Sequence, residues 1–308
     1  MSPKLRQIAT ATGPGTCGEL AQGPWEGREV MITCPVALHA TARVMLCPGH
    51  GRLHTPADAP RTRSALEALP PAAEQDLWLE LDNPLPRGRG MASSTADLCT
   101  ALAARLALEG RHLSARELAR RVLAVEPSDG IMLPGIALFD HREGTVMESL
   151  AEAPPLWVLC LDFGGRVDTL RFNAHPPEPH DPQAADAVAE VHAGLRENDL
   201  KKIAAGATAS ALARQSRLPH PALDEVRRLA EKTGAMGLNR AHSGTVLGLL
   251  FDDPERAEDA GKRILAKALP GLGEAHCLAL TRGGVTVRLA EDANHTDPVR
   301  SWMNVPTG

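Results

Sequence analysis

Short apolar runs, several of them alternating with polar residues, predict β-strands along the chain. Residues 77–81 alternate apolar and charged side chains, which is typical of a strand with one buried face. Residues 156–161 are continuously apolar and predict a buried strand. Residues 36–46 fit either a strand or a helix. Further strands are predicted at residues 30–34, 245–251 and 277–281, and residues 285–289 are predicted to pair with the last of these across a Gly-Gly turn.

Composition and capping residues predict two helices in the first half of the chain. Residues 96–109 are mostly alanine, leucine and other helix-forming residues, and Gly110 stands where helices commonly end. Ser114 and Glu117 have the spacing of a capping box, and the helix that they begin must end before Pro127. Later helical stretches are predicted at roughly 184–213 and 221–233, with an irregular connector at 173–183 and a polar surface excursion at 48–64.

Helices and strands are mixed in both halves, which predicts an α+β fold. At about 150 residues per domain, a chain of 308 residues favours two domains. An Ala-Pro-Pro segment at 153–155 directly precedes the buried strand, and we expect the domain boundary there. The predicted domains are therefore residues 1–153 and 154–308.

Composition argues against several classes of function. The formal net charge of -5 argues against a general nucleic-acid binder, because such proteins usually carry a basic stripe. The N-terminus lacks the apolar core of a signal peptide, and no window approaches the ~20 apolar residues that span a membrane. The six cysteines include no C-x-x-C pair, which argues against a zinc ribbon or a redox dithiol. We expect a cytoplasmic protein with reduced cysteines.

The segment with the clearest chemistry is residues 86–96, PRGRGMASSTA, which we call the phosphate loop. Gly88 and Gly90 let the backbone turn sharply and approach a ligand closely. The helix that begins near Ser94 directs unpaired N–H groups and its positive dipole end into the same space, which favours an anion such as a polyphosphate. Arg87 and Arg89 add positive charge, and a serine hydroxyl there can bind Mg²⁺.

A plainer interpretation of this loop stays open, in which Ser94 and Asp97 only cap a helix after a tight turn. The sequence of the loop nevertheless resembles the central motif of GHMP kinases, P-x-x-x-G-L-G-S-S-A, and differs from this motif at Met91, Ala92 and Thr95. The resemblance implies an ATP-binding loop. The positions that it implies are Pro86, Gly88, Arg89, Gly90, Met91, Ala92, Ser93, Ser94 and Thr95.

Two more segments resemble motifs of the same superfamily and lie in the same order. Residues 14–23, PGTCGELAQG, resemble the first motif, and residues 241–248, AHSGTVLG, resemble the third motif. The resemblance implies a ribosomal-protein-like N-terminal domain and a ferredoxin-like C-terminal domain, with ATP and substrate between them. The implied substrate-binding residues are Thr16, Cys17, Gly18, Glu19, Ser243 and Gly244; for Glu19 a surface position is equally open.

Two acidic residues follow the second predicted helix. In GHMP kinases a helix glutamate commonly binds magnesium and a nearby aspartate often acts as the catalytic base. The resemblance therefore implies that Glu126 is catalytic and, with Ser94, binds Mg²⁺, and that Asp129 is the base. The division of roles between the two acids stays open, because their spacing differs from that in mevalonate kinase. A turn aspartate and a solvent-exposed glutamate would explain the same residues.

Details of four segments narrow the resemblance to the PduX-type L-threonine kinases. These segments are 15–23, 90–97, 126–130 and 137–142. The resemblance implies ATP and L-threonine as ligands, and a product, L-threonine O-3-phosphate, that serves cobalamin synthesis. Homoserine, mevalonate or diphosphocytidyl-methylerythritol kinase activity is the enzymatic alternative, and a catalytically inactive ligand sensor is the other. The oligomeric state is open.

Overall fold

A computed structural model describes residues 6–71, 74–165, 182–215 and 218–292. The elements up to residue 162 are β1 (Arg6–Trp25), β2 (Arg28–Pro48), β3 (Leu53–His54), α1 (Pro60–Glu67), β4 (Gln75–Asp82), α2 (Ser93–Ala107), α3 (Ala115–Leu123), β5 (Ile136–Phe139), β6 (Met147–Ala151) and β7 (Trp157–Asp162). Those that follow are α5 (Pro182–Glu197), α6 (Leu200–Gln215), α7 (Leu223–Thr233), β8 (Gly237–Arg240), β9 (Val246–Phe251), α8 (Pro254–Ala266), β10 (Glu274–Ala279) and β11 (Thr286–Asp292). Both halves therefore mix helices and strands, as predicted.

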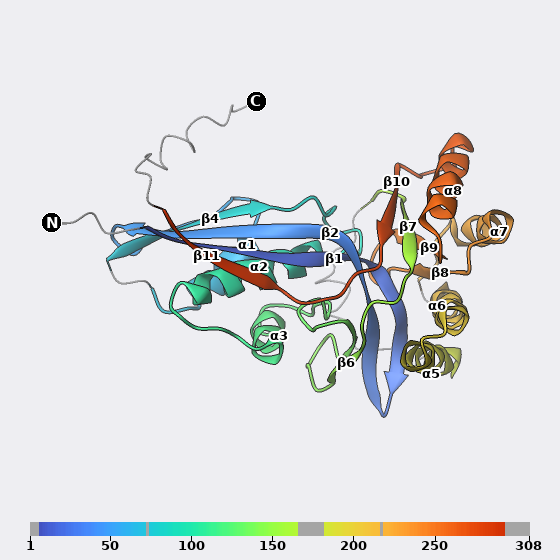
Figure 1. Ribbon diagram of the computed structural model, residues 1–308, viewed down its shortest axis with the longest axis horizontal. Coiled ribbons are helices and arrows are strands. Elements are labelled where there is room, and N and C mark those ends of the chain that lie inside the picture. Colours follow the sequence, from blue (N-terminus) through green and yellow to red (C-terminus); the bar gives the residue numbers. More distant parts are fainter. Residues whose placement is uncertain (1–5, 72–73, 166–181, 216–217, 293–308) are drawn as a thin grey trace.

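The strands form one mixed sheet that runs through both halves of the molecule (Figure 1). The main strand order is β10-β7-β9-β8-β1-β2-β4-β3. Outside this order, β11 pairs with β1, β5 pairs with β2, and β6 pairs with β5. The long antiparallel hairpin of β1 and β2 contains the strands predicted at 30–34 and 36–46. Because β1 pairs with β2 in one half and with β8 in the other, the hairpin links the two halves.

The last strand pairs differently from the sequence prediction, which was wrong about its partner. Strand β10 pairs with β7, whereas β11 lies antiparallel to β1 with Thr10 opposite Arg288. The Gly-Gly turn does not close a hairpin, since Gly283 donates to the Gly135 carbonyl and Gly284 to that of Ile131. The chain is thereby led back to the first half. The domain division at 153 stays a prediction.

Helix α2 lies in the interior, as its composition of alanine and leucine allows. Fourteen of its 15 residues are buried, and the exception is Ser94. The helix packs against β1 and β2, and its first turn forms the end of the phosphate loop. The fold therefore exposes one hydroxyl of this helix at the place where a ligand can reach it.

The other helices partly match the prediction. Helix α3 begins with the predicted capping box of Ser114 and Glu117, and α7 lies within the stretch predicted at 221–233. The stretch predicted at 184–213 is divided into α5 and α6 by Asn198, which has a φ of 54°. The predicted excursion at 48–64 contains β3 and the start of α1. Most of the connector predicted at 173–183 lies outside the described residues.

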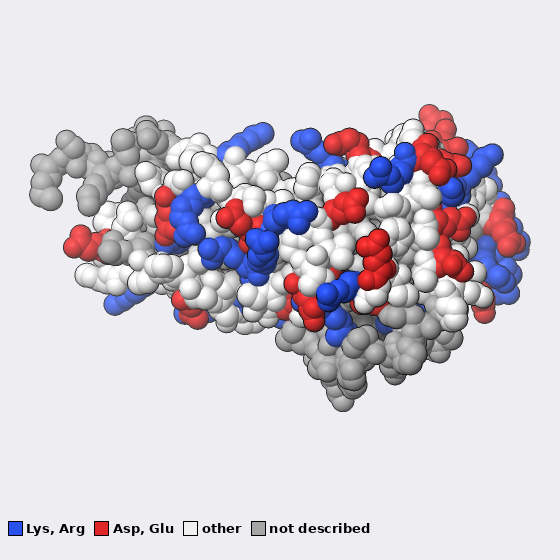
Figure 2. Space-filling model, turned by 90° about the horizontal axis from the view of Figure 1, so that it is seen from below, with Lys and Arg blue, Asp and Glu red and all other residues white. Residues whose placement is uncertain are grey.

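Charged side chains of both signs occur on the described surface. Figure 2 shows acidic and basic side chains interspersed over one face, without a stripe of one sign. Among the helices that the structure describes, none combines the length and the apolar character needed to cross a bilayer.

Candidate active site

Backbone hydrogen bonds join the three motifs. The Gly18 N–H of the first motif donates to the Gly90 carbonyl of the phosphate loop at 3.0 Å. The Thr245 N–H of the third motif donates to the Arg89 carbonyl of the same loop at 2.9 Å. Segments that lie far apart in the sequence therefore form one unit around the phosphate loop.

The glycines of these motifs permit close backbone contact. Gly90 has a φ of 86°, and a Cβ there would lie 2.3 Å from the Cβ of Ala241. A Cβ on Gly244 would lie 2.3 Å from the Arg89 carbonyl oxygen. Since real Cβ atoms do not approach other atoms so closely, larger side chains would push the third motif away from the loop.

A cavity of about 580 Å³ lies against the phosphate loop and the start of α2. Most of the site residues expected from the sequence line it: Glu19, Gly88, Gly90, Met91, Ala92, Ser93, Ser94, Thr95, Glu126, Asp129 and Ser243. The other expected positions, which are not among its lining residues, are Thr16, Cys17, Gly18, Pro86, Arg89 and Gly244. The volume suits a nucleotide or another small molecule.

The start of α2 has the features of an anion site. Its N-cap residue, Ala92, has a left-handed backbone with a φ of 57°, and no side chain caps the helix. The first N–H groups of a helix have no partner within the helix. Here they face a cavity lined by Ser93 to Thr95. The plain N-cap interpretation of Ser94 is therefore wrong, and phosphate binding fits the geometry.

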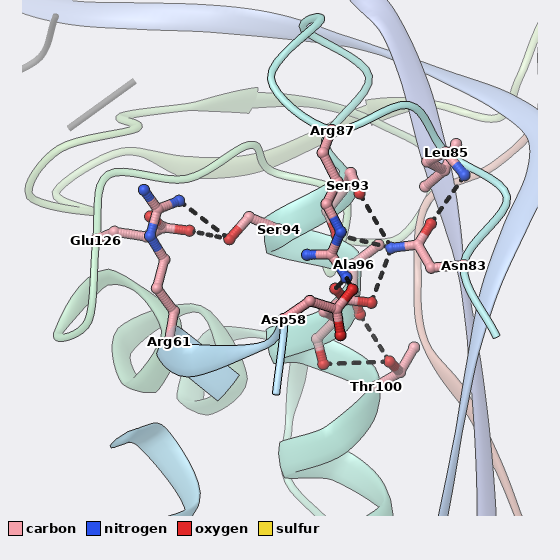
Figure 3. Close-up of polar contacts among 11 residues, drawn as sticks. Asp58, Arg61, Asn83, Leu85, Arg87, Ser93, Ser94, Ala96, Thr100 and Glu126 are labelled. Carbon is pink, nitrogen blue, oxygen red and sulfur yellow. Dashed lines mark hydrogen bonds and ion pairs between the residues drawn. The ribbon is translucent and has the colours of Figure 1, made fainter. Parts of the chain in front are cut away.

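Ser94 contacts Glu126 and Arg61 at the cavity wall (Figure 3). The Ser94 hydroxyl donates to Glu126 Oε1 at 2.5 Å, and Arg61 Nη1 donates to Ser94 Oγ at 3.3 Å. Arg61 Nη1 also lies 2.7 Å from Glu126 Oε2. Burial raises the pKa of Glu126, and the Ser94 hydrogen bond and the Arg61 charge oppose this rise.

These two oxygen-bearing side chains fit a magnesium site. Despite its ion pair with Arg61, the buried Oε2 atom of Glu126 accepts no well-aligned hydrogen bond, so it has a lone pair for a metal. Mg²⁺ bound to a nucleotide usually takes one or two protein oxygens together with phosphates and water. A larger cluster of acidic, histidine and cysteine ligands does not occur among the described residues.

Asp129 lies in the same wall and is oriented by α2. Its backbone N–H donates to Thr95 Oγ1 at 3.4 Å. Burial, together with the negative charges of Glu19 and Glu126, raises the pKa of Asp129 to about 8. A carboxyl group whose pKa lies near the working pH can exchange protons with a bound hydroxyl, which suits general acid–base catalysis.

Glu19 is buried at the cavity rather than exposed on the surface, and it forms a network with His242. Glu19 Oε2 accepts from the His242 backbone N–H at 2.9 Å and lies 3.0 Å from His242 Nδ1. The other ring nitrogen lies 3.2 Å from Ser210 Oγ. Burial alone would raise the pKa of Glu19, but the hydrogen bonds and charge of His242 hold it below its usual range. Glu19 is therefore a buried carboxylate that stays ionised.

The two arginines of the phosphate loop are held by acidic residues. Arg89 forms an ion pair with Asp162 at the end of β7 and does not line the cavity. Arg87 lies 3.3 Å from both Asp97 and Asp58. Both side chains therefore fix the loop in place.

Cys17, an expected site residue, does not line the cavity, and sequence reasoning missed several residues that do. Cys17 Sγ donates to Cys160 Sγ at 2.9 Å. Two of the missed residues are Arg61 and His141; the buried Nδ1 atom of His141 has no hydrogen-bond partner among the described residues. Arg61 lies in a segment without clear periodicity, and His141 lies in the segment 137–142, in a short turn after β5, where the resemblance assigns it no role.

Comparison with known proteins identifies the family. The description "GHMP kinases N terminal domain" matches residues 61–138, and "GHMP kinases C terminal" matches residues 191–270. The chain is 29% identical to the L-threonine kinase of Citrobacter freundii over 293 residues, which cover 91% of this chain and 100% of that protein.

Two solved structures have the same fold. The homoserine kinase from Cytophaga hutchinsonii has a TM-score of 0.71 and 19% identity, over 91% of this chain and 97% of that one. The mevalonate diphosphate decarboxylase from Enterococcus faecalis has a TM-score of 0.60 and 15% identity, over 93% of this chain and 100% of that one. The two family matches, together with the similarity to the L-threonine kinase, show that the chain belongs to the GHMP kinases and is a phosphotransferase with a hydroxyl group as acceptor.

Proposed function

We propose that the protein transfers the γ-phosphoryl group of ATP to the side-chain hydroxyl of L-threonine and releases L-threonine O-3-phosphate. The observation that carries this proposal is the similarity to an L-threonine kinase over 91% of this chain and the full length of that protein. The arrangement of Ser94, Glu126 and Asp129 around one cavity supports it, because these groups suit metal binding and proton transfer.

In this proposal the start of α2 and the phosphate loop hold the triphosphate. Ser94 and Glu126 would hold Mg²⁺, which would neutralise charge on the phosphate oxygens. Asp129 takes the proton from the acceptor hydroxyl as that oxygen bonds to the γ-phosphorus. The bond between the γ-phosphorus and the bridging oxygen breaks, and ADP leaves with the electron pair.

The acceptor is assigned to the part of the cavity near the first and third motifs. Glu19 and Ser243 line it there, and the Glu19 carboxylate is suited to an ammonium group such as that of an amino acid. We further propose a cytoplasmic enzyme whose product enters cobalamin synthesis, as the similarity to L-threonine kinases suggests.

The test is magnesium-dependent ADP release with L-threonine, homoserine, L-serine and mevalonate as parallel acceptors. The proposal requires the highest kcat/KM for L-threonine. Preference for homoserine would instead favour the activity named for the structural neighbour. ATP binding without turnover of any acceptor would favour an inactive ligand sensor.

A further inference from the structure

We propose that Arg61 and the magnesium ion compete for the carboxylate of Glu126. When the metal displaces Arg61, the guanidinium contacts the transferred phosphoryl group. This inference rests on the Mg·ATP site of the proposed function. Arg61 is the second residue of α1, and its Nη1 atom lies 2.7 Å from Glu126 Oε2 and 3.3 Å from Ser94 Oγ. One guanidinium therefore contacts both side chains suited to the metal.

A guanidinium and a divalent cation cannot share this carboxylate oxygen at such a distance without strong repulsion. The Oε1 atom of Glu126 already accepts the Ser94 hydroxyl, so Oε2 is the atom with free capacity for a metal. A guanidinium and a divalent cation this close repel each other strongly at the effective dielectric of a protein surface. Metal binding at Oε2 therefore requires Arg61 to leave it.

The Arg61 side chain can move without a change in the helix. Its side chain is 34% exposed and projects over the open cavity. The backbone beside it is fixed, because Pro60 begins the helix and Thr62 is buried. A rotation of the long side chain is thus sufficient to take the charge from Glu126 to another part of the cavity.

Few other cations can neutralise the transferred group. Among the described residues that line the cavity, only Arg61 and Arg87 are lysine or arginine. Arg87 is held by Asp97 and Asp58, and the first motif contains no lysine or arginine. Phosphoryl transfer requires positive charge at the phosphoryl oxygens. Arg61 loses its partner Glu126 when the metal binds, so it is the residue placed to supply this positive charge.

The first experiment measures metal binding in the absence of nucleotide. Mn²⁺ replaces Mg²⁺, and free Mn²⁺ is followed by electron paramagnetic resonance in wild type, Arg61→Ala, Arg61→Lys and Glu126→Gln. Because removal of a competing cation favours the metal, Arg61→Ala should bind Mn²⁺ about 3- to 10-fold more tightly. Arg61→Lys should stay near wild type, and Glu126→Gln should lose most binding.

The second experiment measures turnover of the same variants. Arg61→Ala should lower kcat by about 100-fold through loss of a contact in the transition state, and Arg61→Lys should recover part of it. Arg63→Ala is the matched control, since Arg63 lies on the same helix and its side chain, among the described residues, forms an exposed ion pair with Glu67. This control should leave both metal binding and kcat unchanged.

Opposite signs for metal affinity and turnover distinguish this role from a structural one. Weaker or unchanged Mn²⁺ binding in Arg61→Ala, or an unchanged kcat, overturns the inference. Full Mn²⁺ binding by Glu126→Gln overturns the metal site itself, and the inference with it. The metal titration needs no acceptor, so it still tests the competition between Arg61 and the metal if L-threonine is not the substrate.

Discussion

Replacement of Asp129 by asparagine should stabilise the protein while it abolishes most turnover. The pKa of Asp129 is raised to about 8 by burial and by Glu19 and Glu126, from a usual value of 3.8. A raised folded-state pKa means that the folded protein binds more protons than the unfolded chain between these values. The contribution of Asp129 to stability therefore falls as pH rises from about 4 to 8.

The size of this effect follows from the pKa shift. The free energy of unfolding changes by at most about 1.4 kcal/mol per pH unit for one such group. Between pH 5 and pH 8 the wild type should therefore lose roughly 3 kcal/mol of unfolding free energy relative to Asp129→Asn. For a chain of this length, that corresponds to a relative shift in Tm of about 5 °C. Asparagine cannot take up the hydroxyl proton, so kcat should fall by about 100-fold or more.

The assay is thermal unfolding of both proteins at pH 5 and pH 8, combined with ADP release. Asp82→Asn is the matched control, because Asp82 is an exposed carboxylate at the end of β4. The control should follow wild type at both pH values. Equal pH dependence of Tm in wild type and Asp129→Asn would refute the electrostatic reasoning, and wild-type turnover in Asp129→Asn would refute the role as base.

Three further predictions concern the nucleotide side of the site. Ser94→Ala and Glu126→Ala should each lower kcat by about 100-fold and raise the Mg²⁺ concentration needed for half-maximal rate; wild-type turnover in either would exclude that role. Ala92→Gly should raise the free energy of unfolding by about 1 kcal/mol in denaturant titration, because the φ of 57° suits glycine. Gly244→Ala should raise the KM for ATP, since its Cβ would press on the Arg89 carbonyl.

Local signals in the sequence predicted the local backbone structure beside the cavity, which depends on short segments. The glycines of the phosphate loop and the start of the following helix lie within a few residues of one another. Their geometry is therefore set by local contacts, which the sequence pattern indicates. The capping box of Ser114 and Glu117 is of the same kind. The resemblance in three motifs then indicated which distant segments meet at one cavity.

Features that depend on distant contacts were not predictable from local pattern. The Gly-Gly turn before β11 is the local signal of a hairpin, but Gly283 pairs with Gly135 and the strand continues to β1. Arg61 has no motif, and its importance follows only from the approach of α1 to Glu126 in space. Burial of Glu19 beside His242 likewise requires both halves of the chain.

The most direct test of the central claim is the identity of the product formed from Mg·ATP and L-threonine. The account predicts a phosphate monoester on the threonine side-chain oxygen, identified by phosphorus NMR, with one ADP released per product. Formation of this product should fall about 100-fold or more in Asp129→Asn. Absence of the phosphate ester with wild-type protein that binds Mg·ATP would contradict the account.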